Sequence, residues 1–424
     1  MKAYKKVLKN GLRVVVVPMK DNPTVTVMVL VEAGSKYEDK ENNGLSHFLE
    51  HMCFKGTTKR PNTNDVALEL DKLGAEYNAF TSQEYTGYYG KVGRRSFKKA
   101  LSIVSDLYLN PLFKAEEIDR ERGVIIEEIN MYEDSPQRTV HDVFMDLLYG
   151  GQSAGMTILG PKENIRKFKS EDFREYRDKY YVAEATTVVV AGDVEKQDVF
   201  EEVEKAFSGI TTSKKVQKKK TKDLQKAPAM ALRYKKTDQS HLVVGVRSLP
   251  LSHKDYLTVE VLMGILGAGM SSRLFFKLRD EMGVCYYVRA FNDGYTDHGS
   301  VGVWAGVNVA RTKEVVEVIL GEFKKLKDEL VSEDELKKVQ EYMIGTMNLR
   351  LEPSDSLADH FGFQEIFNLS IKTPKELSKE IRAVTAKDVQ RLAKKLFVSK
   401  NLNLAVVGPF KDKDKESFNN LLKV

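Results

Sequence analysis

The sequence predicts a protein built from two copies of one α/β unit. Residues 172–192 and 388–408 each show a helical pattern, then an apolar β-branched run, then a glycine, and they match at an offset of 216 positions. The same offset pairs the strand-like segments 25–31 and 241–247. Half of the 424-residue chain is 212 residues, which is close to that offset, so the repeat extends over the whole length.

A lysine-rich stretch lies between the two copies and predicts the domain boundary. Seven lysines fall between Ser213 and Lys226 with no aromatic residue among them, and they supply much of the net charge of +6. Such a run is typical of a solvated linker rather than of a nucleic-acid-binding patch. We predict an N-terminal domain at residues 1–212, a linker at 213–227 and a C-terminal domain at 228–424.

The composition narrows the class of protein and its surroundings. Hydrophobic residues make up 42% of the chain and charged residues 30%, as in globular proteins with real hydrophobic cores. Cys53 and Cys285 form no CxxC pair, which favours a reducing compartment over a disulfide framework. No segment approaches the roughly 18 consecutive apolar residues of a membrane span, and the apolar run near the N-terminus is shorter than a signal-peptide core. We expect a cytoplasmic protein.

The most informative local motif runs from His47 to His51 and reads HFLEH. On a helix, positions i and i+4 share one face, so both imidazoles can converge on one metal ion. Glu50 lies three residues after His47, close enough on that face to hold a metal-bound water. The spacing is that of the inverted zinc motif H-x-x-E-H. Because a catalytic zinc typically takes three protein ligands and a water, a third ligand must come from elsewhere.

The motif is predicted to lie on a buried helix of about three turns. Gly44 before the motif and Gly56 after it are typical start and stop signals, and positions 45, 48, 49 and 52 form an apolar stripe. Buried histidines need polar partners, so a pair of hydrogen-bonded core histidines is the structural alternative to a metal site. A shift of 216 positions reaches residues 263–267, MGILG, which offer no ligand. Only the first copy can carry this metal site.

A second predicted helix, at residues 116–134, is rich in acidic side chains. Glu121 and Glu128 are seven residues apart, two full turns, and therefore point the same way. One of them could serve as a zinc ligand and the other could support the site. Glu127 points about 100° away. The alternative is a solvated acidic helix face, the commonest setting for such glutamates.

Three segments in this order resemble the pitrilysin family of inverzincin metallopeptidases: residues 44–57 (GLSHFLEHMCFKGT), 73–92 (LGAEYNAFTSQEYTGYYGKV) and 121–129 (ERGVIIEEI). The resemblance covers essentially the whole chain, including residues 267–288. It is strongest to the single-repeat-pair type that includes the mitochondrial processing peptidase beta subunit.

The resemblance implies roles for five residues around the motif. His47 and His51 would be zinc ligands, Glu50 the general base, Glu128 the third ligand and Glu121 the supporting glutamate. The Glu127-Glu128 doublet leaves an ambiguity of one residue. We choose Glu128 for its match to the family pattern and its spacing from Glu121.

The resemblance also implies two sets of substrate contacts. Asn78, Ala79 and Phe80 would lie at a sheet edge to which an extended peptide adds as a strand; a plain packed hairpin is the alternative. In the second copy, Arg279 and Tyr286 match a pair that reaches the substrate, and Tyr286 could donate to the scissile carbonyl. The alternative for Arg279 is an ordinary salt bridge with a neighbouring acid such as Glu281. The glycine-rich turn at 264–269 lacks the lysine of a nucleotide-binding loop.

We therefore predict an α+β protein of two homologous domains, each a mainly antiparallel sheet with helices packed on one side. The predicted function is a zinc-dependent endopeptidase, with one Zn²⁺ per chain, that hydrolyses peptides or unfolded polypeptides inside a chamber. The resemblance implies that two chains pair to enclose it, as a homodimer or with a metal-less homologue. A catalytically silent structural subunit of the same family is the alternative function. We expect no nucleic-acid partner and no membrane span.

Overall fold

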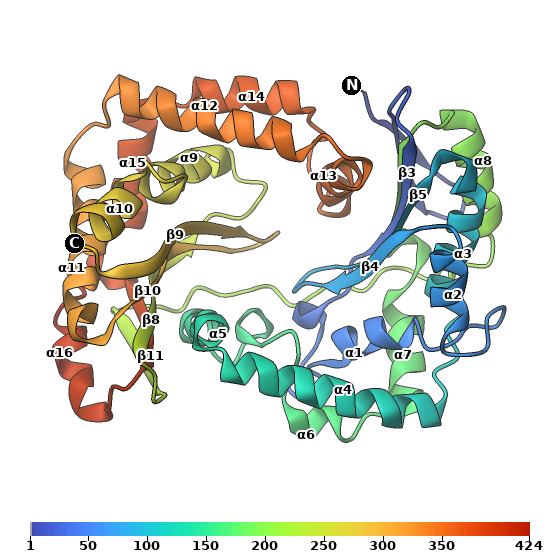
Figure 1. Ribbon diagram of the computed structural model, residues 1–424, viewed down its shortest axis with the longest axis horizontal. Helices are drawn as coiled ribbons and strands as arrows, with labels where there is room; N and C mark the ends of the chain where they lie inside the picture. The colour runs from blue at the N-terminus through green and yellow to red at the C-terminus, as the bar shows by residue number, and fades with distance from the viewer. Residues whose placement is uncertain (1) are drawn as a thin grey trace. The chain divides into compact units, whose positions relative to one another are not determined.

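The computed structural model describes residues 2–424, and the chain divides into two compact units (Figure 1). The first unit extends to Ile129 and also contains residues 157–219 and 348–373. The second unit contains residues 130–156, 220–347 and 374–424. Each unit has its own sheet, its own helices and its own hydrophobic core, so the predicted α+β class is confirmed.

The first unit is built on a six-stranded sheet in the order β1-β2-β6-β3-β5-β4. All neighbouring strands are antiparallel except the parallel pair β2 and β6. Its strands are β1 (Tyr4–Val7), β2 (Arg13–Pro18), β3 (Thr24–Val31), β4 (Glu76–Thr81), β5 (Thr86–Gly93) and β6 (Thr186–Gly192). Its helices are α1 (Leu45–Met52), α2 (Asp65–Asp71), α3 (Phe97–Leu109), most of α4 (Ala115–Asp134), α6 (Lys162–Ile165), α7 (Ser170–Tyr180), α8 (Lys196–Ala206) and α13 (Ser354–Ile366).

The second unit repeats this plan with a five-stranded sheet in the order β7-β11-β8-β10-β9, in which only β7 and β11 are parallel. Its strands are β7 (Ala229–Tyr234), β8 (Gln239–Ser248), β9 (Cys285–Gly294), β10 (Gly299–Asn308) and β11 (Asn403–Gly408). Its helices are α5 (Pro136–Tyr149), α9 (Tyr256–Gly267), α10 (Arg273–Phe275), α11 (Thr312–Asp328), most of α12 (Glu333–Arg350), α14 (Pro374–Ala383), α15 (Ala386–Leu396) and α16 (Lys415–Asn419).

Each sheet is covered on both faces, which differs from the prediction of helices on one side. Strands β6 and β11 are buried along their whole length, as expected for continuous apolar runs rather than alternating ones. A helix from the other half of the chain covers the second face in each case. Helix α13 packs on β3 and β6, and helix α5 packs on β8 and β11 (Figure 1).

The exchange of α5 and α13 means that the compact units do not follow the chain order. Residues 130–156 precede the lysine-rich stretch but belong to the second unit, and residues 348–373 follow it but belong to the first.

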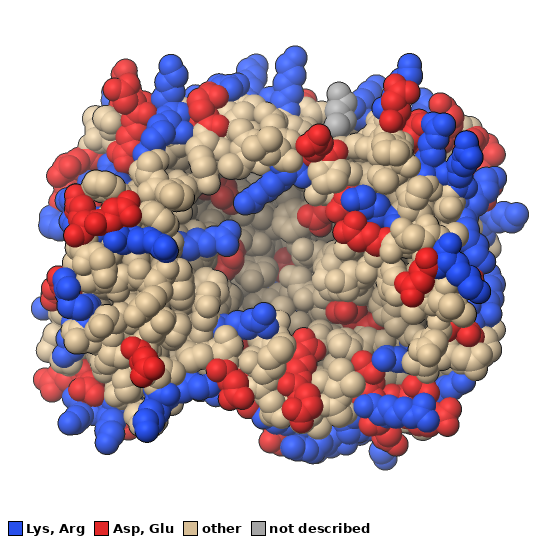
Figure 2. All heavy atoms as spheres, viewed as in Figure 1, with Lys and Arg blue, Asp and Glu red and all other residues tan. Residues whose placement is uncertain are grey.

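The lysine-rich stretch is mostly exposed, although Lys215 is half-buried and pairs with Glu32 at 2.8 Å. On the face drawn in Figure 2, basic and acidic side chains are interspersed rather than gathered into one basic stripe.

Candidate metal centre

The two histidines lie on successive turns of helix α1, whose N-terminus is fixed by a buried carboxylate. Glu38, 2% exposed, accepts hydrogen bonds from the backbone N–H groups of Gly44 at 2.9 Å and Ser46 at 2.6 Å. A negative group at this end of a helix is stabilising because the first N–H groups have no partner within the helix. Gly44 has φ +100°, and a Cβ there would lie 2.6 Å from the carbonyl oxygen of Leu159. This position therefore requires glycine.

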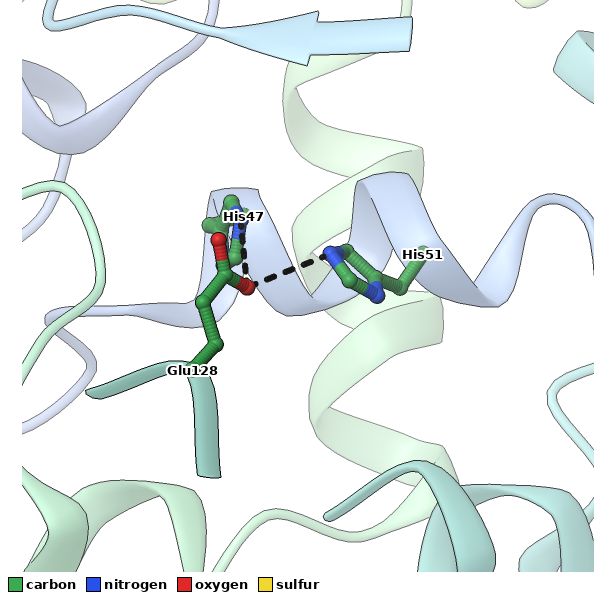
Figure 3. Close-up of side chains that lie close together, drawn as sticks. All are labelled: His47, His51 and Glu128. Atoms are coloured by element: carbon green, nitrogen blue, oxygen red, sulfur yellow. Dashed lines mark ion pairs between the residues drawn. The ribbon is translucent and has the colours of Figure 1, made fainter. Parts of the chain in front are cut away.

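Glu128 on helix α4 faces both histidines (Figure 3). Its Oε2 atom lies 3.6 Å from Nε2 of His47 and 3.8 Å from Nε2 of His51, and one ligand atom from each residue lies within 4.8 Å of the others. Ligands about 2.1 Å from a tetrahedral zinc are roughly 3.4 Å apart, so the three residues fit this ion. Two imidazoles and a carboxylate are also a donor set that zinc accepts.

Glu121 fixes the orientation of the His51 ring. Its Oε1 atom is hydrogen-bonded to Nδ1 of His51 at 2.8 Å, which leaves Nε2 facing Glu128. The other oxygen pairs with Nζ of Lys55 at 2.6 Å. Burial opposes ionisation of Glu121, but the hydrogen bonds with His51 and Lys55 outweigh it and lower its pKa below the ordinary value. A carboxylate behind a histidine in this way sets the tautomer that a metal ligand needs.

His47 has the properties of a ligand rather than of a satisfied core residue. Burial, helped by the nearby His51, lowers its pKa to about 3, so the imidazole is neutral at physiological pH. Its Nδ1 atom is buried and has no hydrogen-bond partner among the described residues. The nitrogen of His47 that faces Glu128 is Nε2, at 3.6 Å, so the unpartnered Nδ1 is the nitrogen on the other side of the ring.

Glu50 lies beside this group, and its carboxylate is held from strand β4. Its side chain is buried, with 8% exposure, and Oε2 accepts a hydrogen bond from the Thr81 hydroxyl at 2.6 Å. Burial raises the pKa of Glu50 above its ordinary value, and the hydrogen bond from Thr81 partly offsets this effect. A raised pKa makes this carboxylate a stronger base than a solvent-exposed glutamate.

The two members of the glutamate doublet differ in exposure and direction. Glu128 is half-buried and points toward the histidines, whereas Glu127 is exposed. The geometry therefore brings together His47, His51 and Glu128, with Glu121 behind them. Thr81, Lys55 and Glu38 were not among the residues predicted from the sequence. Lys55 lies beyond the end of α1 at Met52 and pairs with Glu121 on another helix, a contact that helical spacing does not predict.

The strand that carries Asn78, Ala79 and Phe80 lies at a sheet edge of the first unit. Strand β4 is the outermost strand of the six-stranded sheet and contacts α1. Asn78 is exposed on this edge. Phe80 instead packs over Gly87, where a Cβ would lie 2.2 Å from its ring, and against Tyr85 with ring centroids 5.8 Å apart. The edge position allows strand addition, and Phe80 has a packing role in the hairpin.

Arg279 and Tyr286 are in contact within the second unit. Arg279 lies in the π-helical turn Phe276–Glu281, and its Nη1 atom donates to the carbonyl oxygen of Tyr286 at 2.8 Å. Among the described residues, this contact replaces the salt bridge with Glu281 that was the alternative. Tyr286, at the start of β9, is 58% exposed, so its hydroxyl is accessible to a ligand.

The chain is a duplicated α+β protein with an H-x-x-E-H helix in its first copy and no such motif at the equivalent position of its second copy. Residues 13–162 match the family described as insulinase (peptidase family M16), and residues 167–343 match the peptidase M16 inactive domain. The chain belongs to peptidase family M16. This result confirms the resemblance predicted from the sequence.

Relatives match over nearly the whole chain. A Bacillus subtilis (strain 168) protein named uncharacterized zinc protease YmxG is 34% identical over 407 residues, which cover 95% of this chain and 97% of that protein. Mitochondrial-processing peptidase subunit beta of Mus musculus is 32% identical over 416 residues, 95% of this chain and 83% of that protein. Both names describe peptidases, and the first names zinc.

Solved structures share the fold. A crystal structure of a protease from Helicobacter pylori has a TM-score of 0.89 at 25% identity and covers 96% of this chain and 99% of its own. A peptidase M16 inactive domain from Pseudomonas fluorescens has a TM-score of 0.90 at 15% identity, covers 97% of this chain and 99% of its own, and shows the fold alone. Within residues 2–424, no helix is long and apolar enough to cross a membrane.

Proposed function

We propose that this chain is a zinc-dependent endopeptidase that hydrolyses peptides or unfolded polypeptides. The observation that supports it most is the convergence of His47, His51 and Glu128, with the buried Glu50 beside them. The three residues would hold Zn²⁺, which when bound lowers the pKa of water towards about 7 and polarises a carbonyl group. Membership of family M16 and the names of the relatives support the same activity.

Glu50 takes the proton of the attacking water and passes it to the leaving amine. Its carboxylate lies on the same helix as the two histidines, and a hydrogen bond from Thr81 holds it. Glu121 keeps Nε2 of His51 directed at the ion. Proton transfer by a positioned side chain contributes about 10²- to 10⁴-fold to such reactions.

Substrate binding is proposed for two places. An extended peptide pairs with the β4 edge at Asn78, Ala79 and Phe80, which gives affinity with little demand on side chains. Arg279 and Tyr286 are proposed as further substrate contacts, with the Tyr286 hydroxyl donating to the scissile carbonyl. We further propose that two chains pair around a chamber that admits unfolded peptides, as a homodimer or with a metal-less homologue.

We also propose a cytoplasmic location, because the cysteines Cys53 and Cys285 are free thiols, as is usual in a reducing compartment.

A silent structural subunit remains the competing function within the family. The presence of His47, Glu50, His51 and Glu128 favours the enzyme, because a structural subunit has no use for the complete set. Two measurements on the purified protein test the proposal: metal content, and cleavage of internally quenched peptides of tens of residues before and after chelation. About one zinc per chain and cleavage that chelation abolishes and zinc restores are expected. A zinc-loaded protein that cleaves no unfolded peptide would identify the silent subunit. The molecular mass of the protein in solution shows whether two chains pair.

A further inference from the structure

We infer that Thr81 is a positioning residue for Glu50, an assignment that rests on the proposed peptidase function. The Thr81 hydroxyl donates to Oε2 of Glu50 at 2.6 Å, a short hydrogen bond between β4 and α1. A carboxylate has two oxygens, and rotation about its last side-chain bond is broad. Holding Oε2 restricts this rotation and leaves Oε1 to accept the proton of the attacking water.

Thr81 lies in a hairpin whose turn is hydrogen-bonded to a neighbouring segment. It is the last residue of β4 and lies opposite Thr86, the first residue of β5. The turn between them is fixed to a neighbouring segment: the N–H of Ser35 donates to the carbonyl oxygen of Ser82 at 3.3 Å, and the N–H of Lys36 donates to that of Gln83 at 2.7 Å. This close approach depends on Gly34, where a Cβ would lie 2.2 Å from the carbonyl oxygen of Ser82. The backbone that carries the hydroxyl is thus held by hydrogen bonds on both sides of the turn.

Two further contacts anchor the same turn. Lys36 and Glu84 form an ion pair at 3.1 Å, and both side chains are 1% exposed. Tyr85 packs edge-on against two aromatic rings near the C-terminal end of the exchanged helix α13, with ring centroids 5.9 Å from Phe363 and 5.4 Å from Phe367. The second half of the chain therefore supports the turn that carries Thr81. A hydroxyl held in this way can keep the Glu50 carboxylate within the small range of positions that catalysis requires.

Removal of the hydroxyl tests the assignment. Thr81→Val keeps the shape and the β-branch but leaves Oε2 buried without its donor, and Thr81→Ser keeps a hydroxyl at the same position. We expect Thr81→Val to lower kcat about 10- to 100-fold with KM nearly unchanged, since misplacement of a catalytic group by about 1 Å costs up to this much. Thr81→Ser should stay within about fivefold of wild type. Zinc content should be unchanged in both.

Thr86→Val is the matched control. This threonine lies in the same hairpin, is buried, and donates to the carbonyl oxygen of Ala33 at 3.0 Å rather than to Glu50. Its kcat should stay within about threefold of wild type. An equal loss of kcat in Thr86→Val and Thr81→Val would overturn the assignment, because hairpin integrity would then explain both results. An unchanged kcat in Thr81→Val, a rise in KM alone, or an equally inactive Thr81→Ser would also overturn it.

The experiment separates this inference from the proposed function. If the wild-type protein cleaves peptides and Glu50→Gln does not, the proposed function stands whatever Thr81→Val does. If Glu50→Gln cleaves like the wild type, the proposed function itself is wrong and no role for Thr81 follows from it.

Discussion

Oε1 of Glu121 and Nδ1 of His51 are 2.8 Å apart, and this hydrogen bond links helix α4 to helix α1 directly behind the proposed zinc ligand. It fixes which ring nitrogen of His51 faces Glu128. Lys55 holds the other oxygen of Glu121 at 2.6 Å, so the carboxylate cannot rotate away. The hydrogen bonds of the site therefore extend beyond the three proposed ligands to the residues behind them, as is typical of metal centres in proteins.

Replacement of this carboxylate should weaken metal binding. In Glu121→Gln we expect zinc affinity to fall about 10- to 100-fold, because a neutral amide supports the imidazole less well. Competition with a chromophoric chelator measures the affinity. Glu117→Gln is the control on the same helix, since Glu117 pairs with Arg120 at 2.7 Å and not with the histidines. Equal affinities in the two variants would contradict the supporting role.

The glutamate doublet gives a second test. Glu128→Gln should lose most of its bound zinc during dialysis, because the half-buried Glu128 carboxylate is the proposed third donor of the set. Glu127→Gln should keep about one zinc per chain, because Glu127 is exposed on another face of α4. Metal analysis after dialysis shows which variant has lost its zinc. Loss of zinc in Glu127→Gln but not in Glu128→Gln would reassign the third ligand to Glu127.

The exchanged helix gives a prediction about stability. A Cβ at Gly362 of α13 would lie 2.7 Å from Cδ1 of Leu30 and 3.0 Å from Cγ2 of Val189 on the sheet. Gly362→Val should therefore lower the free energy of unfolding by about 1–3 kcal/mol through overpacking. Urea denaturation followed by circular dichroism measures the change.

The control for that variant is a helical glycine with open space. A Cβ at Gly345 of α12 would meet no atom within 4 Å, and this position is exposed. Gly345→Val should stay within about 0.5 kcal/mol of wild type, since surface substitutions of this kind have small effects. Similar losses at Gly362 and Gly345 would show that helix propensity, not contact with the sheet, sets the result.

Local patterns predicted much of the fold and the side chains that converge at the candidate site. The repeat placed equivalent strands, β6 and β11, correctly because continuous apolar β-branched runs end at a glycine in both copies. The i, i+4 spacing of His47 and His51 and the seven-residue spacing of Glu121 and Glu128 each place two side chains on one helix face. These relations lie within single elements, so the sequence alone reveals them.

Contacts between distant segments were not predictable in this way. Gly362 of α13 packs against Leu30, which is more than 300 residues away in the sequence. No local sequence pattern predicts this contact. The apolar run within β6 is buried on both sides, but we predicted helices on one side only, and the sequence does not show which helix covers the second face. Likewise, Thr81 reads as an ordinary strand residue until the packing of β4 against α1 brings its hydroxyl to Glu50.

The central claim is that Glu50 moves the proton in a reaction for which His47, His51 and Glu128 hold the metal. The most direct test measures zinc content and peptide cleavage together in the wild type and in Glu50→Gln. Glu50 supplies none of the proposed ligand atoms, so the variant should keep about one zinc per chain while its cleavage rate falls at least about 100-fold. Full cleavage by a zinc-loaded Glu50→Gln protein would contradict the claim.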